Sequence, residues 1–136
     1  MTLRIPNGGE QKLLEFMLGK TAIEQFQLRL YSSNTTPGET DTAATYTQVS
    51  GGGYAAVGLT ASNWTATAGA PTAAVYPQVT FSFTGSVGNV YGYYVVGVTS
   101  GTLLWAERFT DGPYNVTTAG DTIRVTPRIT LQDTLD

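Results

Sequence analysis

The chain has 136 residues and a formal net charge of −3, and only 12% of its residues are charged. This length predicts a single domain whose core needs no disulfide or metal to hold it together. The seven lysines and arginines are scattered along the chain, which argues against a nucleic-acid interface and against docking on an anionic membrane.

Histidine and cysteine are both absent from the sequence. Their absence excludes a Ser-His-Asp triad and a thiol nucleophile, and it argues against zinc and copper sites. The N-terminal residues show no basic region followed by an apolar stretch, so we expect no signal peptide. No apolar run reaches the roughly 18 residues of a membrane helix. We therefore expect a protein made in a reducing cytoplasm, with no membrane partner and no cofactor.

Residues 1–24 are predicted to form an arm and one short helix. Asn7 is expected to cap a helix over residues 9–18, with Glu10 in the first turn and Gly19 at the end. The apolar residues of this helix form a broad stripe, which either closes one end of the domain or docks on a neighbouring subunit. The stripe consists of Leu13, Leu14, Phe16, Met17 and Leu18.

The remainder, residues 25–136, shows short apolar runs separated by turns, with no helical segments between them. We therefore predict an all-β fold, an antiparallel β-sandwich or barrel of the jelly-roll kind, preceded by the one short helix and forming a single compact domain with it. Pro127 lies on the apolar phase of the last run and predicts an edge strand or a bulge. The expected strands cover residues 25–32, 45–49, 54–60, 75–84, 90–109 (two strands), 114–117 and 122–131.

The central prediction is a hairpin over residues 90–109. A two-residue turn at Ser100-Gly101 would pair Val96 with Trp105 and would place Tyr93 on the opposite face of the sheet. Both faces of this hairpin are apolar, so we expect both to be covered, one by the core and the other by a second sheet or another subunit. This pattern makes Tyr91, Tyr93 and Trp105 candidate interface residues.

The residues alone leave two kinds of chemistry open, glycoside hydrolysis and calcium binding, and few residues support either. Glu107 and Asp111 are the best-placed carboxylate pair for glycoside hydrolysis. However, Arg108 lies beside Glu107, and Asp111 opens an Asp-Gly-Pro turn in which aspartate is favoured for local hydrogen bonding. A calcium site in the loop of residues 39–41 lacks the spacing of acids that an EF-hand requires. We therefore expect no enzyme and no metal site.

Several blocks of the chain resemble small virion structural proteins of tailed bacteriophages. The order is a leucine-rich helix, a strand, an acidic threonine-rich loop and then three blocks that carry most of the resemblance. The earlier blocks are KLLEFMLG (12–19), FQLRLYSSN (26–34) and TPGETDTAATY (36–46), and the later ones are GGGYA (51–55), GNVYGYYVVG (88–97) and LLWAERFTDGP (103–113).

The resemblance implies a location in the virion and, most specifically, a head decoration or cement protein. Such proteins are usually homo-oligomers, often trimers, that bind the major capsid protein on the outside of the shell. No catalytic motif defines the group, so no active-site residues are implied. Two alternatives stay open: a tail- or fibre-associated protein that binds host glycans through exposed aromatics, and a small carbohydrate-active enzyme that uses Glu107 and Asp111.

Overall fold

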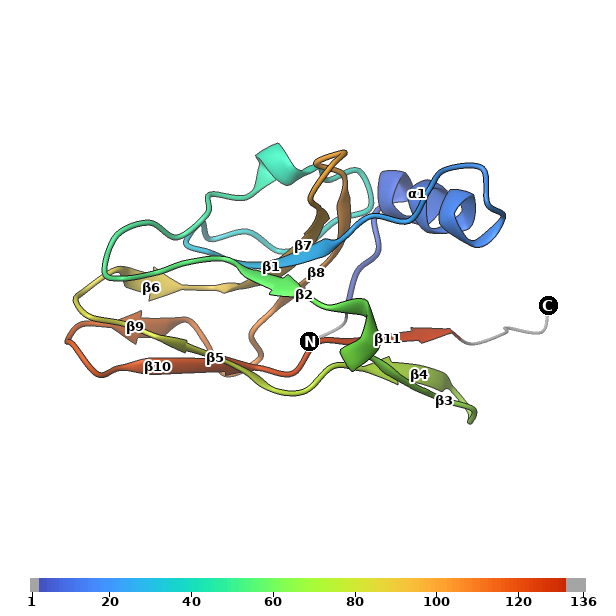
Figure 1. The fold of residues 1–136 in the computed structure, drawn as a ribbon. Helices are drawn as coiled ribbons and strands as arrows, with labels where there is room; N and C mark the ends of the chain where they lie inside the picture. The colour runs from blue at the N-terminus through green and yellow to red at the C-terminus, as the bar shows by residue number, and fades with distance from the viewer. Residues whose placement is uncertain (1–2, 132–136) are drawn as a thin grey trace.

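Two layers of antiparallel strands form the body of the protein in the computed structural model, which describes residues 3–131 (Figure 1). The first layer is a four-stranded sheet in the order β2-β1-β7-β8. Its strands are β1 (Phe26–Tyr31), β2 (Val57–Leu59), β7 (Gly92–Gly97) and β8 (Leu103–Arg108). The short 3₁₀ helices η1 (Ala43–Thr45) and η2 (Ala61–Asn63) lie in the connections that follow β1 and β2.

The second layer is built on two paired segments of chain that are each interrupted near a proline. In the first ladder β5 (Val79–Ser82) pairs with β10 (Thr122–Val125), and in the second β4 (Thr72–Val75) lies between β11 (Arg128–Leu131) and β3 (Thr65–Thr67). Between the ladders the Tyr76 N–H donates to the Pro127 carbonyl at 2.9 Å, so the pairing continues past the proline. Because β11 is an edge strand, the expectation drawn from Pro127 is confirmed.

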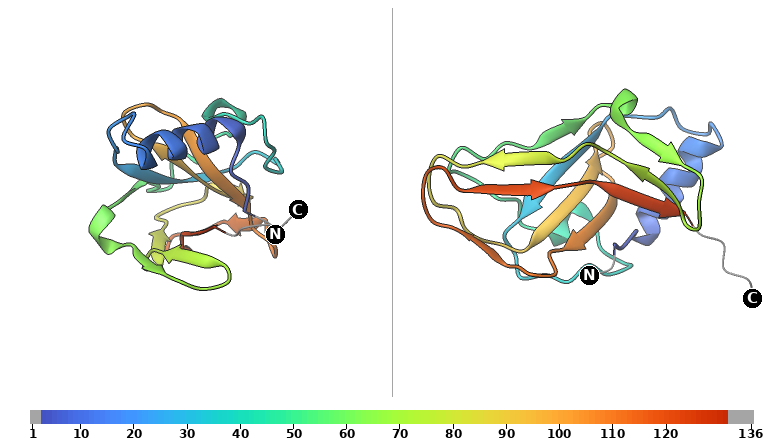
Figure 2. Two further views of the ribbon diagram at one scale, coloured as in Figure 1. Left: turned by 90° about the vertical axis from the view of Figure 1, so that its right-hand side faces the viewer. Right: turned by 90° about the horizontal axis from the view of Figure 1, so that it is seen from below.

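The sandwich is open rather than closed into a barrel. Strands β6 (Gly88–Val90) and β9 (Tyr114–Val116) form a small separate sheet at the end of the molecule opposite the helix (Figure 1). Seen from below, the strands of the two layers cross obliquely, and the helix lies beside one end of them (Figure 2). The all-β fold with a single short helix is therefore confirmed, and of the two architectures considered the sandwich is the one observed.

The main core lies between the two layers and follows the alternation visible in the sequence. Leu28 and Leu30 of β1 are fully buried, and they belong to the same buried cluster as Phe81 from β5 and Ile123 from β10. The alternate residues of these strands are less buried or exposed, except Tyr31 of β1, which is buried in the second cluster on the other face of the sheet. The period-two pattern thus identified the inward-facing residues correctly.

The loop of the β7–β8 hairpin is longer than the two-residue turn expected at Ser100-Gly101. The Gly101 N–H donates to the Gly97 carbonyl, and the Gly97 N–H donates to the Thr102 carbonyl, so four residues, 98–101, form the loop. Gly101 has a φ of +72°, which is the left-handed conformation expected of the turn glycine. The turn residue was therefore identified correctly, but the turn type was wrong.

A register shift in the same hairpin moves Trp105 to the other face of the sheet. A bulge lies between Val95 and Val96, and Trp105 is opposite Val95 rather than Val96. Trp105 consequently shares a buried cluster with Tyr93, whereas Tyr94 belongs to a second cluster. Because side chains alternate along a strand, a shift of one residue is enough to reverse the face.

The second face of the hairpin is covered by the chain's own loop between β1 and β2. That loop brings Tyr46 onto Tyr94 and Tyr31, with ring centroids 5.1 Å apart for Tyr46–Tyr94 and 4.8 Å apart for Tyr31–Tyr46. Burial raises the pKa of the Tyr31 hydroxyl to about 12. The expectation that both faces are covered is confirmed, and the cover is a loop of the same chain rather than a second sheet or another subunit.

Helix α1 (Asn7–Met17) starts two residues earlier than predicted. Its N-cap is Pro6 and no side chain caps it, so the expected capping role of Asn7 is wrong. The end of the helix is as predicted, since Gly19 has a φ of +71°. There the Lys20 N–H donates to the Glu15 carbonyl at 2.9 Å, and the Gly19 N–H donates to the Phe16 carbonyl at 3.2 Å, which is the Schellman arrangement.

The turn between β9 and β10 is held by the carboxylate of Asp121. Its Oδ2 accepts the backbone N–H of Thr117 at 3.0 Å and that of Thr118 at 3.2 Å. These two hydrogen bonds, that of Thr117 first, hold the pKa of Asp121 below its ordinary value. The charged carboxylate therefore stabilises the folded turn.

We expect Asp121→Asn to lower stability at neutral pH and to reduce the sensitivity of the protein to acid. Because the folded carboxyl has the lower pKa, its contribution is fully present above about pH 4 and is lost as the pH falls through the folded value. Urea midpoints measured between about pH 7 and about pH 2 should show the two proteins converging at the acid end. A gap of equal size at every pH would contradict this role.

Candidate interaction surface

A glycine sets the close approach of α1 to β8. Gly9 is buried, and a methyl group on its Cα would overlap the Leu104 carbonyl oxygen and lie 2.8 Å from that of Leu103. Further along the helix, Leu13 and Phe16 pack against the main core. Backbone contact at one end and core packing along the inner face therefore fix which face of α1 is turned to solvent.

The outer face of α1 presents large apolar side chains to solvent. Leu14 is 53% exposed, Met17 70% and Leu18 67%. The predicted apolar stripe is thus divided by the structure: Leu13 and Phe16 close the end of the sandwich, and the other three form a free apolar surface. Six large hydrophobic residues are exposed among the described residues, and these three account for half of them. Such a concentration in one place is a feature of contact surfaces.

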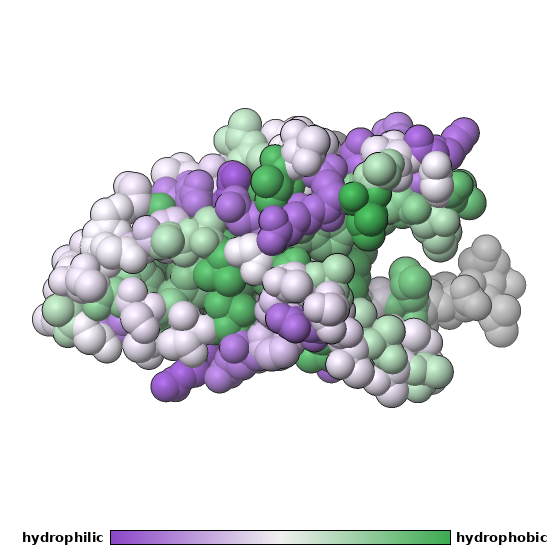
Figure 3. Space-filling view, in the orientation of Figure 1, coloured by the Kyte–Doolittle hydropathy of each residue, from purple (hydrophilic) through white to green (hydrophobic). Residues whose placement is uncertain are grey.

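A groove of about 540 Å³ separates α1 from strands β3, β4 and β11. Leu14 and Met17 line its helical side, and the small side chains of Ala66, Ala73 and Ala74 line its strand side. Leu131, which is 72% exposed, lies on the same lining. Figure 3 shows hydrophobic residues around a hollow between the helix and strands β3 and β4. The exposed stripe and the groove therefore form one surface, which we call the α1 surface.

Charge on the α1 surface is sparse. Glu10 is the single ionisable side chain among the residues that line the groove, and Lys20 follows the other end of the helix. Neither belongs to an ion pair within residues 3–131, whereas Lys12 and Glu15 on the flank of the helix pair at 3.4 Å. The hydrogen bond from the Thr21 hydroxyl is the main cause that lowers the pKa of Glu15. Glu10 and Lys20 therefore lie at the two ends of the apolar stripe without an ion-pair partner among residues 3–131.

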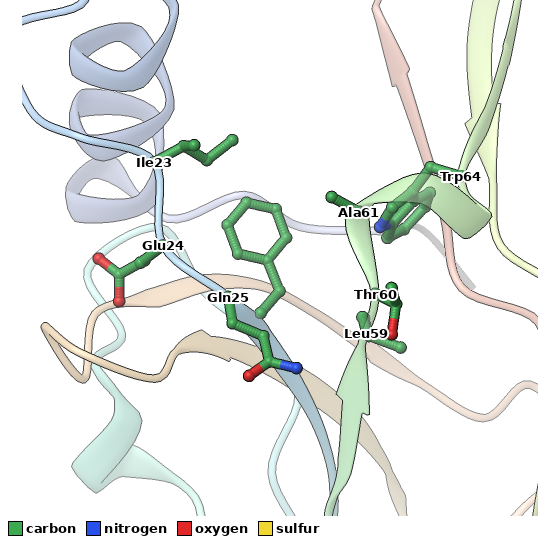
Figure 4. Close-up of a pocket in the computed structure, with 8 residues that line it drawn as sticks. Ile23, Glu24, Gln25, Leu59, Thr60, Ala61 and Trp64 are labelled. Atoms are coloured by element: carbon green, nitrogen blue, oxygen red, sulfur yellow. The ribbon is translucent and has the colours of Figure 1, made fainter.

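A second groove of about 540 Å³ lies beside the start of β1 (Figure 4). Ile23 and Gln25 approach it from one side, and Ala61 and Trp64 approach it from the other. The indole of Trp64 is half-buried and makes T-shaped contacts with the rings of Tyr76 and Trp105. The lining of this second groove is mainly apolar, with a few polar side chains at the rim.

The aromatic residues predicted for the interface have different places from those expected. Trp105 is 1% exposed and Tyr93 is 3% exposed, so both lie in the chain's own core and offer no surface to a partner. Tyr91 is half-buried and has the Arg108 guanidinium 5.1 Å from its ring centroid. Of the eight predicted interface residues, only the three outer helix residues form an exposed apolar patch.

The two carboxylates considered for hydrolysis are each hydrogen-bonded to a tyrosine. The Tyr93 hydroxyl donates to Glu107 Oε1 at 3.1 Å, and the Tyr114 hydroxyl donates to Asp111 Oδ1. Burial, and then the charge of Glu107, raise the pKa of Tyr93. Each carboxylate therefore has a structural role, because it accepts the hydrogen bond of a neighbouring tyrosine hydroxyl.

The acidic loop considered for calcium uses its carboxylates to hold itself in place. Asp41 Oδ2 accepts the Gly38 N–H and the Tyr46 hydroxyl, both at 2.8 Å, and Glu39 pairs with Arg4 at 3.0 Å. Within residues 3–131 no group of three or more acidic, histidine or cysteine side chains is arranged to hold a metal ion. In the same range no helix is long and apolar enough to span a membrane.

Sequence patterns did not identify the strand side of the groove. Ala66, Ala73 and Ala74 fall in residues 61–74, for which the sequence predicted no strand. The structure shows that this stretch contains β3 and most of β4, which pair with each other. The sequence indicates this side of the groove only through a run of alanines and threonines. Their small side chains leave room for large side chains on a facing surface.

Comparison with known proteins adds no relative to this description. No protein-family model, no curated protein and no solved structure matches the chain.

Proposed function

We propose that the protein is a structural component of a tailed-bacteriophage virion, and most specifically a head decoration or cement protein that bridges subunits of the major capsid protein. The observation that carries this proposal is the α1 surface, an apolar patch and groove held rigidly by the sandwich. In a chain with so few charges, such a surface favours lasting contact with a protein neighbour over binding of a charged small molecule.

The residues support a role in assembly in two further ways. The carboxylates that chemistry would need are hydrogen-bonded to tyrosines or paired with arginine. The fold is held by packing alone, without cysteine, so it is independent of the redox state of its surroundings. A cement protein that binds only the assembled shell stabilises that shell by mass action.

The test is to mix the purified protein with empty phage shells that lack it. We expect saturable co-sedimentation and a higher melting temperature of the shells, because binding to the assembled form alone shifts its equilibrium. Leu14→Glu should weaken the binding at least about tenfold, because it places a charge in the middle of the apolar patch. Ala119→Glu, on an exposed loop at the other end of the molecule, is the matched control. Shells that neither bind the protein nor gain stability would contradict the proposal.

A tail- or fibre-associated protein with glycan binding is the alternative, and the second groove is the observation in its favour. Sugars stack on aromatic faces and accept hydrogen bonds from polar groups at the rim, and Trp64, Gln25 and Thr60 provide these groups there. Micromolar-to-millimolar binding of a sugar to the protein, combined with indifference to shells, would favour this alternative.

A further inference from the structure

We propose that the α1 surface binds the same surface of a second copy of this chain. In this dimer the two α1 helices lie antiparallel across a two-fold axis that passes near Leu14, and the exposed side chains of each copy enter the groove of the other. The inference deepens the proposed function, on which it rests for its biological setting, by naming a second copy as the neighbour that this surface meets. The dimer then bridges two capsid subunits, one through each copy, and Leu14→Glu weakens shell binding because it separates the two copies.

The shape of the surface is the first argument. Large exposed side chains, Leu14 and Met17, lie directly beside a groove whose far side is built from Ala66, Ala73 and Ala74. A projection and a recess next to each other on one face make that face complementary to a copy of itself after a two-fold rotation. The small side chains of β3 and β4 allow an incoming leucine or methionine to approach the strands closely.

Charge complementarity is the second argument and selects the antiparallel orientation. Residues 10, 14 and 17 are spaced three and four apart, so Glu10, Leu14 and Met17 lie in one row along the helix. When two such rows run antiparallel with their Leu14 residues facing, position 10 lies opposite position 18 of the other copy. Glu10 then lies within about one helical turn of the other copy's Lys20.

Both charges are available for this pairing. Glu10 and Lys20 are exposed, and neither takes part in the ion pairs of the described residues. The two-fold axis would form the Glu10–Lys20 contact twice, and the two helix dipoles would oppose each other favourably. A parallel arrangement would instead place Glu10 beside Glu10 and Lys20 beside Lys20, which is repulsive.

The test is a charge exchange measured by sedimentation equilibrium at low ionic strength, on the full-length protein without shells. We expect a dimer for the wild type, and a dimer dissociation constant that rises at least about 30-fold in Leu14→Glu. Glu10→Lys alone and Lys20→Glu alone should each weaken the dimer roughly 3- to 10-fold, since each replaces two attractive contacts by repulsive ones. The double exchange Glu10→Lys/Lys20→Glu should return to within about twofold of the wild type, because it restores opposite charges.

Three results would overturn the proposal: a monomer at all concentrations up to the millimolar range, a trimer, or a Leu14→Glu protein that dimerises normally. Failure of the double exchange to restore the dimer would overturn the antiparallel arrangement on which it depends. Ala119→Glu should dimerise normally, and circular dichroism of every variant checks that it is folded. A dimer that ignores shells would contradict the virion role and leave this inference standing, whereas a monomer that binds shells would do the reverse.

Discussion

Trp105→Ala is expected to lower the free energy of unfolding by about 3–5 kcal/mol, the largest effect of any change considered for this protein. The indole is 1% exposed and its ring centroid lies 6.0 Å from those of both Phe26 and Trp64. Removing the indole leaves a cavity in the core, between Phe26 at the start of β1 and Trp64 in the connection after β2. Domains of this size have total stabilities of about 5–15 kcal/mol, so this variant would be close to unfolding at room temperature.

The measurement is urea unfolding followed by far-ultraviolet circular dichroism, since tryptophan fluorescence would itself change. Trp105→Phe is the informative companion, because it keeps an aromatic ring against Phe26 and should lose considerably less stability. Val98→Ala, at an exposed position in the loop between β7 and β8, should change stability by no more than about 0.5 kcal/mol. If Trp105→Ala unfolded at the same urea concentration as the wild type, Trp105 would not be at the centre of the core.

Gly9→Ala should destabilise the protein by roughly 1–3 kcal/mol, although the same change normally favours a helix. The added methyl group has no room beneath α1, because it would meet the carbonyl oxygens of Leu103 and Leu104 on β8. Backbone oxygens cannot move aside as a flexible side chain can, so the helix itself must lift. Hydrogen exchange of the α1 amides should therefore accelerate together with the loss of stability.

Gly8→Ala is the matched control for this effect. Gly8 is the preceding residue of the same helix, and nothing lies within 4 Å of a methyl group placed on it. Alanine there is expected to be neutral or stabilising by up to about 1 kcal/mol, because only helix propensity changes. Equal behaviour of the two variants would mean that α1 does not rest on β8 through Gly9.

Gly9→Ala also connects the fold to the proposed contact. The helix forms one side of the groove, so lifting it from β8 moves Leu14 and Met17 relative to Ala73 on the strand side. We therefore expect this variant to weaken self-association as well, even though Gly9 itself is buried and contacts no partner. The rigidity of the α1 surface depends on this close approach of helix and strand.

Local patterns in the sequence were sufficient for the elements whose two faces differ in character. In β1 the alternation placed Leu28 and Leu30 inward, and the helix ended at Gly19 as its left-handed conformation requires. The short apolar runs separated by turns, with no helices between them, predicted an all-β sandwich or barrel. These inferences hold because side-chain period and backbone conformation are properties of a few neighbouring residues.

The hairpin shows where local patterns stop being informative. Both faces of β7 are apolar, so the sequence contains no polar side that could report the register, and the loop length alone set the pairing that we expected. The actual loop has four residues and the strand carries a bulge. This is why Trp105 and Tyr93 were assigned to a possible interface when they lie in the core.

The same distinction applies to the candidate surface. From the helical pattern alone, residues 13–18 were identified as a single apolar stripe, and their composition is sufficient to predict that some of them are buried. Which of them face inward depends on where β8 lies beneath Gly9, and the groove exists only because β3, β4 and β11 come to lie across from the helix. Period and turn chemistry are encoded within short segments, whereas register, the cover on each face and the groove arise from packing between segments far apart in the chain, and no local pattern specifies that packing.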